Sequence, residues 1–143
     1  MKKNDLISEE LKRIAESNGG ILKAEDVVES AKVETSVLHD CFIWDDTAAA
    51  VQYRLYQARN LIRCVVTFEP RKEVTVRAFV SLTPDRENPG GGYRNVIAIL
   101  ENKTHREQML ADAFAELKVF ETKYQALTEL AEVFEVIRKV KNK

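Results

Sequence analysis

The chain has 143 residues, 45% of them hydrophobic and 31% charged, with a formal net charge of −1. This composition is typical of a soluble globular protein with one hydrophobic core, or with two small lobes that share one, and the near-neutral charge provides no global field that attracts nucleic acid. Two cysteines exclude a disulfide framework, no apolar run approaches the ~20 residues of a membrane span, and no signal peptide follows Met-Lys-Lys, so we expect a reducing cytoplasm.

The first residues of the chain have the apolar spacing of a helix. A first helix is indicated by apolar residues at steps of three and four, namely Leu6, Ile7, Leu11, Ile14 and Ala15. Asp5 or Ser8 can cap its start, and Asn18-Gly19-Gly20 can end it because glycine takes the left-handed conformation readily. A short extended piece, 21–23, then precedes a second helix whose inward residues are Val27, Val28 and Ala31.

The next helix is predicted from about Thr47 to Arg63, after the block Leu-His-Asp-Cys-Phe-Ile-Trp-Asp-Asp at 38–46. Asp45 or Asp46 can accept hydrogen bonds from its first free N–H groups. One apolar stripe is predicted on it, consisting of Ala48, Val51, Leu55, Ala58 and Ile62. The polar residues divide into Tyr53, Gln57 and Asn60, which point away from the stripe, Arg54, Tyr56 and Arg63 on its flanks, and Arg59 at its edge, where we expect a salt bridge.

A period of two then predicts strands at 64–68 and 74–82, joined as a hairpin by the charged turn 69–73. The glycine-rich segment 84–92 is loop-like, and 93–100 is predicted as a third, antiparallel strand. Helical spacing returns near Thr104. It breaks near Gln125 and resumes in a final helix with apolar residues Leu127, Leu130, Val133, Phe134, Ile137 and Val140.

This order predicts an α+β fold. Its N-terminal part is winged-helix-like with an antiparallel β-hairpin or three-stranded sheet, and a C-terminal helical hairpin follows. We expect a winged-helix-like domain over 1–82, a glycine-rich loop and third strand over 83–103, and the helical hairpin over 104–143. The last helix has apolar residues over a broad arc, so the hairpin is expected to hold a homodimer together.

Several blocks carry a resemblance to a known family. They are Gly-Gly-Ile-Leu-Lys-Ala-Glu-Asp-Val-Val (19–28), the Trp-Asp-Asp block at 38–46, Tyr-Arg-Leu-Tyr-Gln-Ala-Arg-Asn-Leu-Ile-Arg (53–63), Arg-Ala-Phe-Val-Ser-Leu (77–82) and Gly-Gly-Tyr-Arg (91–94). Together they resemble a family of small uncharacterised proteins of tailed bacteriophages and prophages, over nearly the whole chain. The family pattern has Pro where this chain has Val37. The resemblance implies a viral origin, localisation in the host cytoplasm and, by association, a DNA-related function.

Two functions are compatible with these residues. In the leading hypothesis the 47–63 helix and the 69–73 turn bind double-stranded DNA in phage DNA metabolism or regulation. Base edges would meet Tyr53, Gln57 and Asn60 beside Tyr56, and phosphates would meet Arg54, Arg63, Arg71 and Lys72. In the alternative, exposed Tyr53 and Tyr56 or the glycine-rich loop bind a host or phage protein without nucleic acid.

Other chemistry has weaker signals. The loop Pro89–Gly92 with Arg86, Tyr93 and Arg94 could hold a phosphate, but it lacks the P-loop lysine, so a flexible connector is favoured. Zinc binding is not expected. The candidate ligands are His39, Cys41, Cys64 and His105, and their spacing in the sequence matches no known zinc module. No nucleophile stands beside a base, so we expect neither a cofactor nor enzymatic activity. Trp44 is expected to pack over the helix start rather than to bind a partner.

Overall fold

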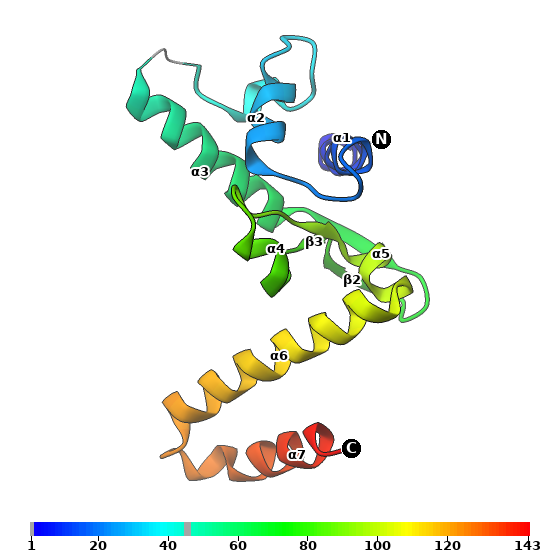
Figure 1. Ribbon diagram of the computed structural model, residues 1–143, viewed down its shortest axis with the longest axis vertical. Helices are drawn as coiled ribbons and strands as arrows, with labels where there is room; N and C mark the ends of the chain where they lie inside the picture. The colour runs from blue at the N-terminus through cyan, green and yellow to red at the C-terminus, as the bar shows by residue number, and fades with distance from the viewer. Residues whose placement is uncertain (1, 45–46) are drawn as a thin grey trace.

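The computed structural model describes residues 2–44 and 47–143, and its fold is a mixed α+β fold (Figure 1). Its helices and strands follow in the order α1 (Lys3–Ser17), α2 (Ala24–Ala31), α3 (Ala48–Cys64), β1 (Val66–Glu69), β2 (Val74–Arg77), β3 (Phe79–Val80), α4 (Thr83–Glu87), β4 (Arg94–Asn95), α5 (Val96–Glu101), α6 (Lys103–Tyr124) and α7 (Ala131–Lys141). Short 3-10 turns lie at His39–Cys41 and Thr128–Leu130. No helix in the described part of the chain is long and apolar enough to cross a membrane.

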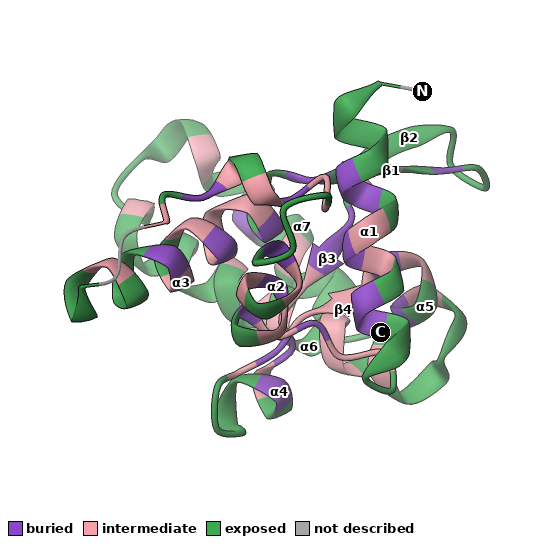
Figure 2. Cartoon of the chain, turned by 90° about the horizontal axis from the view of Figure 1, so that it is seen from above, coloured by how far each residue is buried: buried purple, intermediate pink, exposed green. Residues whose placement is uncertain are grey.

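One hydrophobic core lies where α1, α2, the second half of α3 and β3 meet (Figure 2). Leu11, Leu22, Ile62 and Phe79 are completely buried there. Burying such a side chain contributes about 1.5–3 kcal/mol, so these contacts dominate the stability of the body. Ala58 is also completely buried, and its small side chain lets α3 approach its neighbours closely.

The turn after α1 and the extended piece that follows it are confirmed. Gly19 and Gly20 have φ angles of 63° and 89°, which glycine adopts without strain. Leu22 then pairs with Tyr93 through two backbone hydrogen bonds, of 2.7 and 2.8 Å. This bridge attaches the glycine-rich loop to the N-terminal body, although 70 residues separate the two segments in sequence.

The predicted cap of α1 is wrong. The helix begins after Lys2, whose side chain makes no capping hydrogen bond, so Asp5 and Ser8 both lie within the helix. Asp5 instead occupies the first turn, where a negative charge favours the helix dipole, and Ser8 is buried. The N-terminus of α1 therefore depends on this charge and on core packing more than on a side-chain cap.

The apolar stripe predicted on α3 is buried only in the second half of the helix. Ala58 and Ile62 are completely buried, whereas Ala48 is exposed and Val51 is 46% exposed. The start of α3 extends past α1 and α2 (Figure 1), whereas Leu55, further along the helix, packs against the core. Thr47 is the N-cap, and its hydroxyl accepts a hydrogen bond from the backbone N–H of Ala50. The capping predicted for Asp45 or Asp46 lies outside the described residues.

The β1–β2 hairpin is confirmed, with Val66 opposite Arg77 and Glu69 opposite Val74. The predicted 74–82 strand, however, is interrupted at Ala78. Its N–H donates to the carbonyl of Val65, and its own carbonyl accepts from the N–H of Val96. β3 then pairs with β4, so the described strands form two sheets of two strands and the predicted three-stranded sheet is wrong.

The third strand predicted over 93–100 is wrong beyond its start. Only Arg94–Asn95 is a strand, and Val96–Glu101 is the helix α5. The side chain of Asn95 accepts a hydrogen bond from the N–H of Ile97 and so begins the helix. A short apolar run such as 96–100 fits a buried strand and a buried helix equally well by its pattern. The loop-like 84–92 segment also contains part of a helix, α4, with Pro84 in its first turn.

The two C-terminal helices form an arm that runs away from the body (Figure 1). Their break after Tyr124 lies next to the predicted position, Gln125. The described residues of α6 include no buried side chain, and on α7 only Phe134 is buried. The ring of Phe134 lies 6.2 Å from that of Phe120, and Arg138 pairs with Glu121. These contacts fold α7 back against the far end of α6.

Candidate functional site

A hollow of about 450 Å³ lies beside the second half of α3. We call it the arginine cleft because four of its lining residues are Arg59, Arg63, Arg77 and Arg86. The other lining residues include Ala24, Val80, Ser81, Tyr93, Glu116 and the glycines Gly90, Gly91 and Gly92. The cleft thus combines guanidinium groups with an exposed glycine backbone.

Three separate elements bring the arginines together. Arg59 and Arg63 lie four residues apart on α3, so they share one face of the helix. Arg77 ends β2, and Arg86 lies on α4. The long-range pairing of β3 with β4 and of Leu22 with Tyr93 brings these elements to one place. Sequence reasoning therefore identified Arg63 but had no signal that Arg77 belongs beside it.

Three of the four arginines of the cleft have no ion-pair partner among the described residues. Arg59, Arg63 and Arg77 form no ion pair with any carboxylate that the structure describes, so the salt bridge expected for Arg59 is absent from that part of the chain. Among the lining residues, Glu116 is the one acid. Arg86 lies near the Asp112 carboxylate, whose pKa it helps to lower, so three of the four guanidinium groups lack an acidic partner among the described residues and would favour an anion.

α4 forms one wall of the cleft, and hydrogen bonds hold this helix in position. The Arg86 guanidinium donates to the carbonyl of Ser81 at 2.6 Å and to the Thr83 hydroxyl at 2.7 Å. Asp112, on α6, accepts from the hydroxyl and the backbone N–H of Thr83, at 2.7 and 3.0 Å. Burial raises the pKa of Asp112, but these bonds and one from Gln108 outweigh it, so the pKa lies below its usual value.

At Gly92 the glycine-rich loop approaches the body too closely for a side chain. A Cβ on Gly92 would lie 2.7 Å from the Cγ2 of Ile21, and one on Gly90 would lie 3.0 Å from the Glu25 carboxylate. Gly90 and Gly91 also have φ angles of 80° and 66°. The loop therefore borders the cleft with backbone groups, because both space and backbone conformation require glycine.

The exposed face of α3 continues the cleft along the helix. Tyr53 and Tyr56 are 48% and 56% exposed, and their rings stack with centroids 6.1 Å apart. At 100° per residue, both tyrosines lie on the same side as Asn60 and Arg63. From Tyr53 to Arg63 the helix rises by about 15 Å. Aromatic, amide and guanidinium groups thus form one continuous strip.

Arg54 does not belong to this strip, so its predicted role as a phosphate anchor is wrong. It is only 8% exposed, its guanidinium donates to the carbonyl of Ile43, and it lies 5.3 Å over the ring of Trp44. Trp44 also stacks on His39, with centroids 5.1 Å apart. The packing role expected for Trp44 is confirmed. Gln57 is engaged in the same region, because its Oε1 accepts from the N–H of Ile43 at 3.4 Å.

The hairpin tip is also separate from α3. Arg71 pairs with Glu69 and with Glu101, each at 3.1 Å, and Lys72 is exposed beside it. Figure 1 shows the tip next to α5, across the body from the first half of α3. The predicted site residues are therefore divided between two places, and only those on α3 adjoin the arginine cleft.

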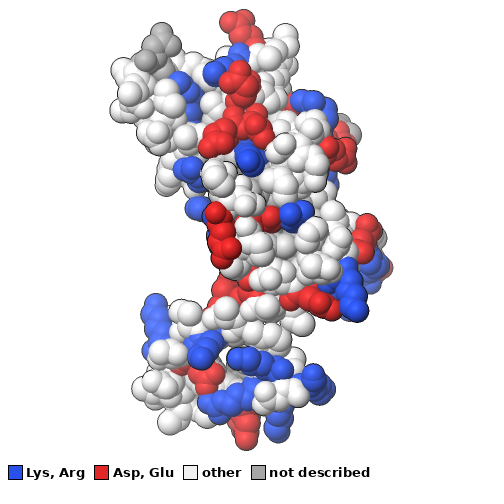
Figure 3. Space-filling model, viewed as in Figure 1, with Lys and Arg blue, Asp and Glu red and all other residues white. Residues whose placement is uncertain are grey.

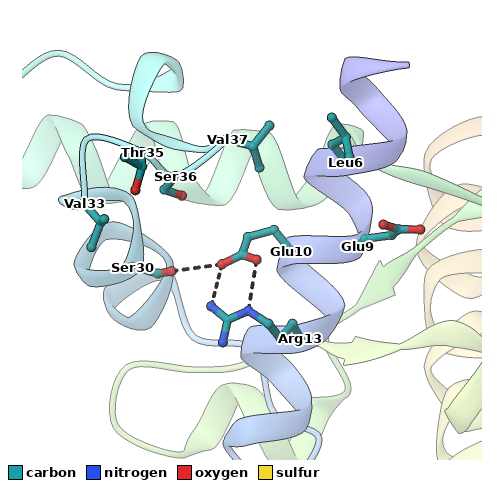
Figure 4. Close-up of a pocket in the computed structure, with 9 residues that line it drawn as sticks. All are labelled: Leu6, Glu9, Glu10, Arg13, Ser30, Val33, Thr35, Ser36 and Val37. Atoms are coloured by element: carbon teal, nitrogen blue, oxygen red, sulfur yellow. Dashed lines mark hydrogen bonds and ion pairs between the residues drawn. The ribbon is translucent and has the colours of Figure 1, made fainter. Parts of the chain in front are cut away.

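A second hollow, of about 560 Å³, lies between α1 and the segment after α2 (Figure 4). Glu10 there accepts hydrogen bonds from Arg13 and from the hydroxyl of Ser30. The bond from Arg13 holds the pKa of Glu10 below its usual value. Because Glu10 and Arg13 pair with each other, the remaining charged side chain of this hollow is the carboxylate of Glu9. Figure 3 shows acidic and basic atoms interspersed over the body, with basic atoms gathered on α7.

Metal chemistry finds no support in the described residues, which include no group of three or more His, Cys, Asp or Glu side chains placed to hold an ion. Burial raises the pKa of the Cys41 thiol, which disfavours the reactive thiolate.

Comparisons with protein-family profiles, with curated proteins and with solved structures found no match to this chain.

Proposed function

We propose that the protein binds DNA through the arginine cleft and the exposed face of α3. The observation that carries this proposal is the unpaired state of Arg59, Arg63 and Arg77 within the described residues. By contrast, four arginines elsewhere each pair with a carboxylate, namely Arg13, Arg71, Arg94 and Arg138. Guanidinium groups match phosphate oxygens in geometry and charge, so unpaired arginines around a hollow suit a phosphate.

A polymeric ligand fits better than a small anion. A small anion would occupy the cleft alone and leave Tyr53, Tyr56 and Asn60 without a role. From Arg59, which lines the cleft, to Tyr53 the strip on α3 rises by about 9 Å, which allows a chain of nucleotides to contact both. Its tyrosines and Asn60 provide ring faces and an amide for bases, while the arginines contact phosphates.

The arrangement of elements also supports α3 as the contact helix. The order of α1, the short pairing at Leu22, α2, α3 and the β1–β2 hairpin is the order of a winged helix, whose third helix contacts DNA. We accordingly retain Arg63, Tyr53, Tyr56 and Asn60 as contacts and replace Arg54, Arg71 and Lys72 by Arg59, Arg77 and Arg86. A role in phage DNA metabolism or regulation is part of this proposal.

The test is fluorescence anisotropy of labelled DNA at low and moderate salt. We expect salt-sensitive binding, because each phosphate contact releases counterions. The double variant Arg59→Ala/Arg63→Ala is expected to bind at least about tenfold more weakly. Arg13→Ala, which removes an exposed arginine paired with Glu10, is the matched control and should bind like the wild type. Absence of binding at tens of micromolar protein in low salt would contradict the proposal.

Assembly with a second copy of the chain is a further proposal, and the arm favours it. α7 has 11 residues and α6 has 22, so α7 can cover only about half of its neighbour. Large apolar side chains on the arm are therefore exposed, among them Leu110, Val119, Val133, Val136 and Val140. We propose that the arm is the contact of a homodimer, in which a second copy covers these side chains.

A further inference from the structure

The stacked pair Tyr53 and Tyr56 is the clearest exposed aromatic feature of the body. A single exposed aromatic ring needs no explanation, but these two rings stack with 23° between their planes. Tyr56 also precedes Arg59 by three residues and Asn60 by four, so one helical turn joins the rings to the cleft. A ligand held in the cleft has ring faces within its reach.

Most of the α3 side chains that were predicted to read base pairs in the major groove are engaged in contacts within the protein. That readout depends on amide and guanidinium side chains projecting from the groove-facing side of a helix. Arg54 is buried over Trp44, and Gln57 is bonded to the backbone of Ile43. Asn60 is the one predicted amide reader without such a partner among the described residues.

The cationic groups are also poorly arranged for a duplex. A duplex presents its phosphates on a stiff, convex surface, so its partners usually spread their contacts along two backbones. Here the arginines of three elements converge on one hollow, and Glu69 and Glu101 neutralise Arg71 at the hairpin tip. A concave site of this kind suits a flexible strand that can turn one phosphate inward.

We propose that the DNA bound by this protein is single-stranded, with a backbone phosphate in the arginine cleft and a neighbouring base stacked on Tyr53 or Tyr56. This inference rests on the proposed function. Positively charged grooves beside exposed aromatic rings bind single strands with little regard to sequence, because every base has a face that can stack. The pair of rings gives the strand a second anchor one to three helical turns from the phosphate.

The experiment compares a labelled oligothymidylate of about 15 nucleotides with a duplex of the same length, in the same anisotropy assay. We expect the single strand to bind at least about tenfold more tightly. Tyr53→Leu/Tyr56→Leu should weaken single-strand binding roughly five- to a hundredfold, the range measured for loss of one stacked base. Tyr53→Phe/Tyr56→Phe keeps both rings and should bind like the wild type.

Three outcomes separate this inference from the function beneath it. Duplex binding as tight as single-strand binding, lost with Arg59→Ala/Arg63→Ala, would overturn the inference and leave DNA binding standing. Single-strand binding that needs the arginines but not the rings would overturn the stacking role. Binding of neither DNA would overturn both. Both tyrosines are exposed, so circular dichroism of the leucine variant should match that of the wild type and show that it is folded.

Discussion

Arg94 and Asp85 form a two-bond ion pair behind the glycine-rich loop. The Arg94 Nε lies 2.7 Å from Oδ2 of Asp85, and its Nη2 lies 2.9 Å from Oδ1. Because Asp85 is 5% exposed, the pair fixes α4 against β4 from inside the body. The pair therefore stabilises the position of α4, which carries Arg86 into the cleft. Because Arg94 is bound to Asp85, it is not among the proposed phosphate contacts, although it lies next to the glycine-rich loop.

Arg94→Ala is expected to destabilise the protein by about 3 kcal/mol, because it leaves a buried carboxylate without its partner. Urea unfolding measures this as a shift of the midpoint. Arg13→Ala breaks an exposed ion pair and should cost less than about 1 kcal/mol. Equal losses in the two variants would show that the Asp85 carboxylate is better solvated than its burial indicates.

The stability contributed by Asp112 should depend on pH. Its pKa in the folded protein is lowered, so its contribution is fully present above the unfolded pKa of about 3.9 and is lost as the pH falls through the folded value. Asp112→Asn should therefore be less stable than the wild type at pH 7, and the difference should shrink below about pH 4. Urea unfolding at several pH values tests this. A difference that is constant with pH would contradict the assigned cause.

Two residues of the predicted α3 stripe should respond differently to truncation. Ile62→Ala removes completely buried atoms and is expected to cost about 2–5 kcal/mol. Val51→Ala truncates a side chain that is 46% exposed and should change the free energy of unfolding by less than about 1 kcal/mol. Thermal or urea unfolding compares them directly. A large loss for Val51→Ala would mean that a partner or a second copy covers this side chain.

The arm should make the protein a dimer. Light scattering after size exclusion is expected to give about twice the chain mass of 16.3 kDa. Val136→Glu/Val140→Glu places two charges on the exposed side of α7 and should give the monomer mass. Val33→Glu alters an equally exposed valine on the body and serves as the control. A monomer mass for the wild type at high micromolar concentration would contradict the proposal that the arm is a homodimer contact.

Local pattern predicted most of the body correctly. The helices around Leu11 and Val27, the turn at Gly19 and Gly20, and the β1–β2 hairpin all depend on residues close in sequence, so their signals are local. The 96–100 run failed because five apolar residues carry no period that separates strand from helix. Its outcome depended on the Asn95 cap and on the pairing of Ala78 with Val96.

The candidate site was harder to predict because its residues come from distant segments. Arg63 and the tyrosines were visible as one face of one helix. Arg77 had no such signal, since its place beside Arg63 depends on where β2 ends and how β3 pairs. The burial of Arg54 was equally hidden, because it follows from the position of Trp44 over α3.

The most direct test of the account is the salt dependence of DNA binding, measured for the wild type and for Arg63→Ala. We predict that the logarithm of the association constant falls linearly with the logarithm of salt concentration, and that Arg63→Ala reduces the slope by about one. Arg71→Ala, at the neutralised hairpin tip, should leave the slope unchanged. A slope that Arg71→Ala reduces and Arg63→Ala does not would contradict the arginine cleft as the site of DNA binding.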